Sequence, residues 1–284
     1  MTLRARALLR VGALAVLFGV AAIDGIQAAP AVPQASTGPV GYWPLDETDV
    51  NSLSVFDATS NGNNGTRTPT NGGTDTPAQI STDVAPVPGP ANLRSLLCNA
   101  DTDRPEGALI SDGAGASLNI SGPLTLSVWV KIAGSGPTRT DNMGVVERLQ
   151  NPGSGYSGYF LRLYRRDVGG GVFEYVPAFT TSNAGSHTSV GAANSDFVAR
   201  GVWTHLAAVY DGTNLHLYKN GTSVASNPGS APGAIATTLS IGNDKGDNRF
   251  HGNVDEVRVF NRALTQSEIG VLINGQPAPT NLNV

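Results

Sequence analysis

The sequence contains a single cysteine, Cys98, so no disulfide bond can form within the chain. Charged residues are also scarce, at 14% of 284 residues, and the net charge is -4. Lysine and arginine form no basic stripe, which argues against a nucleic-acid partner. Because Leu96 and Leu97 precede the cysteine, we expect its thiol to be buried and chemically inert.

Long hydrophobic runs are missing except near the amino terminus. Residues 11–23 form an almost purely apolar run after a positively charged flank, and small residues follow at Ala28 and Ala29. This pattern is typical of a secretory signal peptide and is too short to span a bilayer comfortably. We therefore predict a signal peptide over 1–29 and a flexible leader over 30–39. The mature protein is then secreted without a membrane span, and a retained anchor is the alternative.

Glycine and proline, by contrast, are abundant, with 35 and 18 residues, as expected where many short strands need turns. Apolar residues occupy every second position of 124–132, and residues 159–164 alternate in the same way. Residues 214–224 have the pattern of a hairpin in which Asn220 and Gly221 supply a turn with positive φ. Repeated short strands of this kind predict a two-sheet β-sandwich.

One helix is predicted near the carboxyl end of the chain. Thr265 is a good N-cap, and Glu268 three positions later completes a capping box. We expect this short helix to plug one end of the sandwich and residues 277–284 to form a tail. Residues 68–92, rich in proline, threonine, glycine and asparagine, are expected to form a long surface loop.

Four segments carry a resemblance to a known family: 41–47 (GYWPLDE), 124–131 (LTLSVWVK), 203–212 (WTHLAAVYDG) and 250–269 (FHGNVDEVRVFNRALTQSEI). Together, and in this order, they resemble the concanavalin A-like jelly rolls of the laminin G-like class found in secreted bacterial proteins. The resemblance implies an all-β, two-sheet antiparallel jelly-roll sandwich with one short C-terminal helix. We place this domain at residues 40–276.

The class hosts hydrolases and lyases as well as lectins, adhesion modules and spacers. Laminarinase-type glucanases of this fold carry a Glu-x-Asp-x-x-Glu strand, and alginate lyases carry Gln-x-His; neither motif occurs here. Zinc-type His-Glu-x-x-His and the Gly-x-Ser-x-Gly elbow are missing too. We therefore predict that the chain is not an enzyme. A polysaccharide-degrading hydrolase or lyase is the least favoured alternative, with Glu147 and Arg148 as residues for a cleft.

The resemblance also implies a structural calcium ion near Asp255, which lies on the last long strand. The first and last strands pair in this class, so Asp46, Asp57 and Asn61 are the further candidate metal ligands. Calcium takes carboxylate and amide oxygens of this kind. The alternative is that Asp57 and Asn61 form Asx turns and Asp255 makes a local hydrogen bond. Residues 243–249 are a second oxygen-rich segment, for which a solvated hairpin tip is the simpler interpretation.

Sugar recognition needs an aromatic platform and planar polar groups. Trp129, Arg162, Tyr164 and His216 provide that chemistry at outward positions, provided that their strands are neighbours on one open sheet; packing is the alternative role for Trp129. We predict a secreted carbohydrate-binding or adhesion module whose partner is a glycan, a polysaccharide or a cell-surface or matrix protein. The second interpretation is a structural or protein-interaction domain without a sugar site, using loops such as 68–92.

Overall fold

The computed structural model describes the following residues: 38–69, 77–88, 92–98, 106–134, 142–170, 172–242 and 248–275. They belong to one compact unit that begins at Thr37. The predicted signal peptide, most of the leader and the tail lie outside the described residues, so they remain predictions. No helix in the described ranges is long and apolar enough to cross a membrane.

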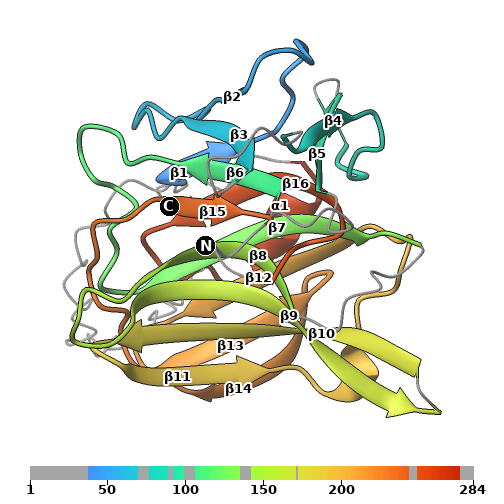
Figure 1. Cartoon of the computed structure of the whole chain (residues 1–284). Helices are drawn as coiled ribbons and strands as arrows, with labels where there is room; N and C mark the ends of the chain where they lie inside the picture. The colour runs from blue at the N-terminus through green and yellow to red at the C-terminus, as the bar shows by residue number, and fades with distance from the viewer. Residues whose placement is uncertain are drawn as a thin grey trace, which may run out of the picture. The chain divides into compact units, whose positions relative to one another are not determined.

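The described strands form two antiparallel sheets of eight strands each, which confirms the predicted sandwich (Figure 1). Sheet A contains β1 (Gly41–Trp43), β4 (Gln79–Ser81), β5 (Ser95–Cys98), β7 (Leu124–Ile132), β12 (Thr204–Tyr210), β13 (Asn214–Lys219), β14 (Thr222–Pro228) and β16 (Gly252–Phe260). Sheet B contains β2 (Ser54–Val55), β3 (Gly65–Pro69), β6 (Glu106–Ile110), β8 (Met143–Gln150), β9 (Ser157–Gly169), β10 (Val172–Asn183), β11 (Ser186–Gly191) and β15 (Leu239–Ile241). A 3-10 turn, η1 (Asn194–Asp196), and one helix, α1 (Gln266–Ile273), complete the described elements.

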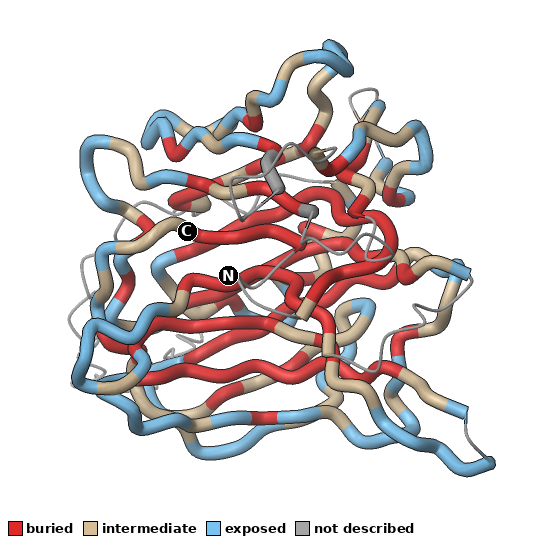
Figure 2. Tube along the Cα trace, viewed as in Figure 1, coloured by how far each residue is buried: buried red, intermediate tan, exposed pale blue. Residues whose placement is uncertain are grey.

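The core lies between the two sheets, where the alternating apolar residues of the strands meet. Leu126 and Val130 of sheet A are fully buried, and so are Leu161 and Leu163 of sheet B, as the alternation predicts. Figure 2 shows burial concentrated in the strands at the middle of the molecule. Cys98 is buried in the same core, as predicted. The predicted chemical inertness of its thiol stays a prediction.

The first and last strands of the domain pair, as the resemblance implies. Tyr42 of β1 lies opposite Arg258 of β16, and the Arg258 guanidinium is 4.1 Å from the centre of the Tyr42 ring. A bulge in β16 separates Asp255 from Arg258 in the pairing with β7, and Glu256 within it has a φ of 54°. A bulge of this kind changes the direction of neighbouring side chains. It therefore affects the part of β16 that carries Asp255.

Helix α1 packs on the outer face of sheet A, which corrects the expectation that it plugs an end of the sandwich. Its residues Ile269 and Leu272 form a small second core with outward residues of the sheet, Ala207, Val209 and Phe260. The predicted capping box at Thr265 is present, with the Glu268 N–H donating to the threonine hydroxyl. The predicted Asn220–Gly221 hairpin turn is confirmed as well, with φ values of 50° and 79°.

The segment 68–92 is more than the surface loop that its composition predicts. Part of it forms strand β4, which pairs with β5, and Ala78 and Ala85 are buried. Asp83 accepts a hydrogen bond from the Trp203 indole at 2.9 Å and lies 2.6 Å from the Lys131 ammonium. Ala78 thus contributes to the core between the sheets, whereas Asp83 lies against Lys131 on the outer face of sheet A. The local sequence reveals neither of these partners.

Candidate functional site

The outer face of sheet B carries a row of alternating aromatic and arginine side chains along β9. Phe160, Arg162, Tyr164 and Arg166 occupy every second position of this strand, on the face opposite the buried Leu161. The Arg162 guanidinium lies 4.1 Å from the centre of the Phe160 ring, and the Arg166 guanidinium lies 5.3 Å from that of Tyr164. We call these four residues the β9 ladder.

Neighbouring strands add polar groups to the same face. Glu147 of β8 lies opposite Phe160, and its Oε2 accepts hydrogen bonds from Arg162 Nη2 at 2.5 Å and Nε at 3.0 Å. On the other side of β9, the hydroxyl groups of Thr180 and Ser189 lie 2.8 Å apart. Arg162 and Tyr164 keep intermediate exposure, whereas Glu147 and Phe160 are buried. A carboxylate, a guanidinium, hydroxyl groups and aromatic rings therefore share one face.

The carboxylates of this face do not form a glycosidase pair. The described part of the face carries Glu147 and Glu174, which lie opposite Phe160 and Arg166 of β9. Six positions along a strand correspond to about 20 Å, at about 3.3 Å per residue. Glycosidases hold their two carboxyl groups about 5–9.5 Å apart. These two residues therefore cannot act together on one glycosidic bond.

The four residues predicted to bind sugar do not lie on one sheet. Arg162 and Tyr164 belong to sheet B, whereas Trp129 and His216 belong to sheet A. The condition of one shared open sheet is therefore not met. His216 remains partly exposed and lies 2.8 Å from an Asp211 carboxylate oxygen. Trp129 is only 5% exposed, so its surroundings fit the alternative role, in which it packs against its neighbours.

Trp129 packs beside a buried histidine on the outer face of sheet A. Its ring meets that of His205 edge-on, with centroids 5.4 Å apart, and Ser127 Oγ lies 2.9 Å from His205 Nε2. Burial, and secondarily the charge of Arg258, lowers the pKa of His205 to about 3. The native state therefore holds this imidazole neutral at neutral pH.

This pKa predicts acid destabilisation. The unfolded chain takes up the His205 proton near pH 6.5 and the native state only near pH 3, so stability is present above pH 6.5 and is lost as the pH falls through this window. The loss from this group reaches about 1.4 kcal/mol per pH unit at most. Urea unfolding between pH 7 and 4 should show a shallower decline for His205→Gln than for the wild type. Parallel declines would contradict the prediction.

Two of the four predicted calcium ligands, Asp57 and Asn61, use their side chains in hydrogen bonds to the backbone. The Asp57 carboxylate accepts hydrogen bonds from the backbone N–H groups of Tyr42, Thr59 and Asn63, at 2.9–3.0 Å. The Asn61 amide donates to the Val40 carbonyl oxygen at 2.9 Å. The alternative interpretation, an Asx turn, describes Asp57, whose Oδ1 accepts the N–H of Thr59 two positions later. Asn61 forms no such turn, because its side-chain amide donates to a carbonyl oxygen 21 positions away.

Asp255 has different surroundings. It is fully buried, and its Oδ2 accepts hydrogen bonds from the Ala85 N–H at 2.8 Å and the Asn92 amide at 3.1 Å. Its Oδ1 and the Asn92 Oδ1 are buried without a hydrogen-bond partner. Burial, followed by the negative charges of Glu256 and Asp46, raises the pKa of Asp255 to about 8. Among the described residues, no positively charged side chain contributes to this shift, so the ionised form of Asp255 has no compensating positive charge there.

Asp46 joins Asp255 through the same chain segment. Its Oδ1 accepts hydrogen bonds from the backbone N–H groups of Leu93 and Arg94, directly after Asn92. We call Asp46, Asn92 and Asp255 the Asp255 site. In the described part of the chain, no three histidine, cysteine, aspartate or glutamate side chains gather as a metal cluster. The oxygen donors of the Asp255 site nevertheless fit a hard cation such as calcium, because two of its buried oxygens have no partner. Of the second oxygen-rich segment, 243–249, residues 243–247 lie outside the described residues, so its interpretation as a solvated hairpin tip stays a prediction.

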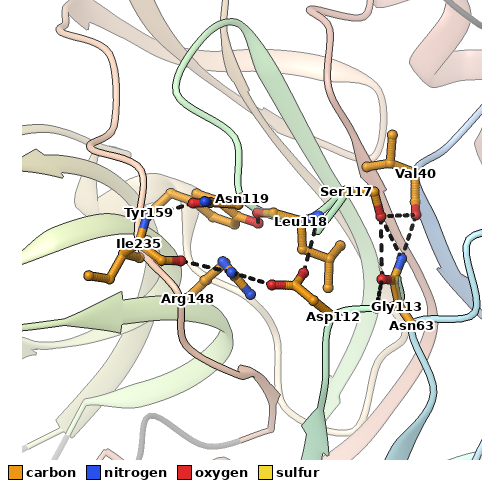
Figure 3. Close-up of polar contacts among 10 residues, drawn as sticks. All are labelled: Val40, Asn63, Asp112, Gly113, Ser117, Leu118, Asn119, Arg148, Tyr159 and Ile235. Carbon is orange, nitrogen blue, oxygen red and sulfur yellow. Dashed lines mark hydrogen bonds and ion pairs between the residues drawn. The ribbon is translucent and has the colours of Figure 1, made fainter. Parts of the chain in front are cut away.

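Glu147 and Arg148 do not share a cleft, because successive residues of a strand point to opposite faces. Arg148 lies opposite Tyr159, inside the sandwich, and is 0% exposed. Its Nη2 donates to Asp112 Oδ2 at 2.6 Å and to the Ile235 carbonyl oxygen at 2.8 Å (Figure 3). Its Nε and Nη1 have no partner. Arg148 is therefore a buried cation with one counter-charge.

The two packed antiparallel sheets define the chain as a concanavalin A-like β-sandwich. Residues 107–270 match the family described as the concanavalin A-like lectin/glucanases superfamily, and the chain belongs to this family. The resemblance carried by the four sequence segments is thereby confirmed.

Curated relatives cover part of the chain. It is similar to pappalysin-1 of Mus musculus, with 26% identity over 197 residues, which is 64% of this chain and 12% of the relative. It is also similar to the adhesion G-protein coupled receptor V1 of Danio rerio, with 30% identity over 165 residues, 56% of this chain and 2% of the relative. The chain thus spans a small part of both proteins.

Solved structures share the fold at low sequence identity. Domain 4 of an extracellular arabinanase from Geobacillus stearothermophilus, in complex with arabinotriose, has a TM-score of 0.55 and 20% identity, covering 84% of this chain and 100% of that one. The binding domain of botulinum neurotoxin DC has a TM-score of 0.57 in complex with rat synaptotagmin II, with 13% identity, covering 84% and 51%. The same binding domain in complex with SialylT has a TM-score of 0.56 and 12% identity, with the same coverage.

Proposed function

We propose that this chain is a secreted, non-catalytic carbohydrate-binding or adhesion module that binds glycans on the outer face of sheet B. The observation that carries the proposal is the β9 ladder, in which aromatic rings and arginines alternate beside Glu147. The similar arabinanase domain in complex with arabinotriose, and the similar neurotoxin binding domain in complex with SialylT, support it.

The chemistry of the ladder suits a sugar ring. The half-exposed ring of Tyr164 offers an apolar face for the C–H groups of a sugar, while Arg162 and Arg166 offer planar donors for hydroxyl oxygens. The Glu147–Arg162 pair fixes the guanidinium in one orientation, which lowers the entropy that binding must restrict. Adhesion to a glycan on a cell surface or in the matrix follows from the same contacts.

The test is a glycan and polysaccharide array probed with the full chain. Tyr164→Ala is expected to weaken binding to any recognised glycan about tenfold, because it removes the aromatic face. Tyr156→Ala is the matched control, since Tyr156 is 48% exposed and lies outside the ladder. Absence of any glycan binding by the folded protein would overturn the proposal. Equal losses in the two variants would move the site away from β9.

We further propose that the Asp255 site binds a structural calcium ion. Asp255, Asn92 and Asp46 would hold the ion with carboxylate and amide oxygens, and the ion would supply the positive charge that the buried carboxylate lacks. Asp255 lies beside Trp129 on the outer face of sheet A, and the ladder lies on the outer face of sheet B. The ion would therefore stabilise the fold without touching a sugar bound at the ladder.

A further inference from the structure

A cavity opens where the last strands of the two sheets come together, β2 of sheet B and β4 of sheet A. Figure 1 shows both strands in the upper part of the molecule. The cavity volume is about 430 Å³, within the range of about 300–1,000 Å³ typical of ligand sites. Its walls consist of residues from both sheet edges: Val50, Asn51, Leu53, Arg67, Pro77, Gln79 and Ile80. No part of the β9 ladder or of the Asp255 site belongs to it.

Arg67 is the buried polar residue of this cavity. It is 2% exposed, and its guanidinium donates to the carbonyl oxygens of Ala78, Val50 and Ser52, which ties the two walls together. Its Nε is buried without a partner. Because the arginine already holds three carbonyl groups, it fixes the width of the cavity. The apolar and amide groups above it are left to contact an occupant.

The rim of the cavity is unusually apolar for a surface. Val50 and Leu53, which line the cavity, are 63% and 44% exposed, and Phe56, three positions further along the chain, is 58% exposed. The amide side chains of Asn51 and Gln79 line the cavity between them. An apolar anchor point flanked by side-chain amides suits an extended polypeptide. One apolar side chain of the polypeptide can pack in the anchor point, and its backbone N–H and C=O groups can form hydrogen bonds with the amides.

Strand β4 adds an open edge to this surface. Within the described residues it pairs with β5 alone and is the last strand of sheet A. The last strand of a sheet presents backbone N–H and C=O groups that an added strand can pair with. Gln79 and Ile80 of β4 also line the cavity. A peptide added to this edge would therefore pass directly over the cavity.

Negatively charged side chains beside the cavity favour a partner that carries a positive charge. Burial lowers the pKa of Arg67, and the negative charges of Glu47 and Asp49 lie near enough to oppose this shift in part. The Glu47 carboxylate accepts a hydrogen bond from the Phe56 N–H at 2.9 Å, which holds it beside this exposed ring. Asp49 is exposed. A basic side chain on the partner would find these carboxylates next to the anchor.

We propose that this cavity and its rim bind an extended segment of a partner protein, in which one apolar side chain fills the cavity and an adjacent lysine or arginine pairs with Glu47 or Asp49. This protein-binding surface is independent of the glycan site. It lies partly within the segment 68–92, to which the sequence assigns an interaction role in its second interpretation. It therefore gives that role a location and a chemistry.

The experiment begins with a displayed library of random 12-residue peptides selected on the full chain. Enriched peptides are then synthesised and titrated against the wild type and Leu53→Asn, which removes a partly exposed apolar wall without opening the core. Val172→Asn is the matched control, because Val172 is 53% exposed on the distant β10. Asp49→Asn tests the charge, with titrations at low and high salt.

We expect peptides that combine a large apolar residue with a neighbouring lysine or arginine. Their binding should weaken at least tenfold in Leu53→Asn, stay unchanged in Val172→Asn, and depend less on salt in Asp49→Asn than in the wild type, because Glu47 is then the remaining carboxylate beside the cavity. Failure to enrich such peptides, or equal binding to Leu53→Asn, would overturn the proposal. Two other results would also overturn the proposal, because each would show a different occupant of the cavity. One is a saccharide whose binding depends on Leu53, and the other is a dimer in sedimentation velocity that Leu53→Asn dissociates. Tyr164→Ala should leave peptide binding intact. A negative result for peptide binding would therefore not contradict the glycan site, which the glycan array tests separately.

Discussion

Calcium at 100-fold excess over its dissociation constant is expected to raise the melting temperature of the wild-type chain by about 5–10 °C, and to leave Asp255→Asn unchanged. A ligand that binds only the native state stabilises it by about 2.7 kcal/mol at this excess. For a domain of this size, 1 kcal/mol corresponds to about 2–4 °C. The measurement is a thermal melt in chelator and in calcium.

The physical reason lies in the two buried oxygens without partners, Asp255 Oδ1 and Asn92 Oδ1. A buried carboxylate without a counter-charge is costly, and a cation that it coordinates offsets this cost. Asparagine at position 255 keeps the size and the hydrogen-bonding oxygen but removes the charge that attracts the ion. Its response to calcium should therefore disappear.

Asp57→Asn is the control that separates the two groups of predicted ligands. It should lower the basal melting temperature, because Asp57 accepts three backbone N–H groups, and still respond to calcium. A wild type that ignores calcium, or an Asp255→Asn variant that responds fully, would contradict the proposed site. Loss of the calcium response in Asp57→Asn would instead support the four ligands predicted from the sequence, namely Asp46, Asp57, Asn61 and Asp255.

The sequence predicts the faces of the strands better than it predicts their neighbours. Alternation places Leu161 in the core and Arg162 and Tyr164 outside, because the side-chain period of a strand is two. It carries no information on which sheet receives a strand. Tyr164 and His216 therefore look equivalent in the sequence, yet they lie on different sheets.

The Asp255 site shows the same limit at long range. The family resemblance points to Asp255, but Asn92 lies 163 positions away, in a segment whose composition predicts only a loop. No spacing rule connects the two residues. Helix α1 shows both cases. Its capping box depends on neighbouring residues in the sequence and is predicted correctly. Its docking on Ala207 and Phe260 depends on the sheet and is not predicted.

Asp112→Ala is expected to lower the free energy of unfolding by about 3 kcal/mol, because it leaves Arg148 as an uncompensated buried cation. Arg148 is 0% exposed, and Asp112, at 2.6 Å, is its counter-charge. Urea unfolding of the full chain measures the loss. The partly exposed pair Lys219–Asp196, 3.7 Å apart, provides the control, since Asp196→Ala should cost at most about 1 kcal/mol.

The double-mutant cycle distinguishes a lost contact from a stranded charge. Arg148→Met removes the cation and keeps an apolar side chain of similar length, and Asp112, whose side chain is 19% exposed, can then be hydrated. The double variant Arg148→Met/Asp112→Ala should therefore be more stable than Asp112→Ala alone, since no buried charge remains. If the two losses simply add, Arg148 and Asp112 act independently. The interior of the sandwich would then tolerate the arginine without its partner, against the expectation from its two unpartnered nitrogens.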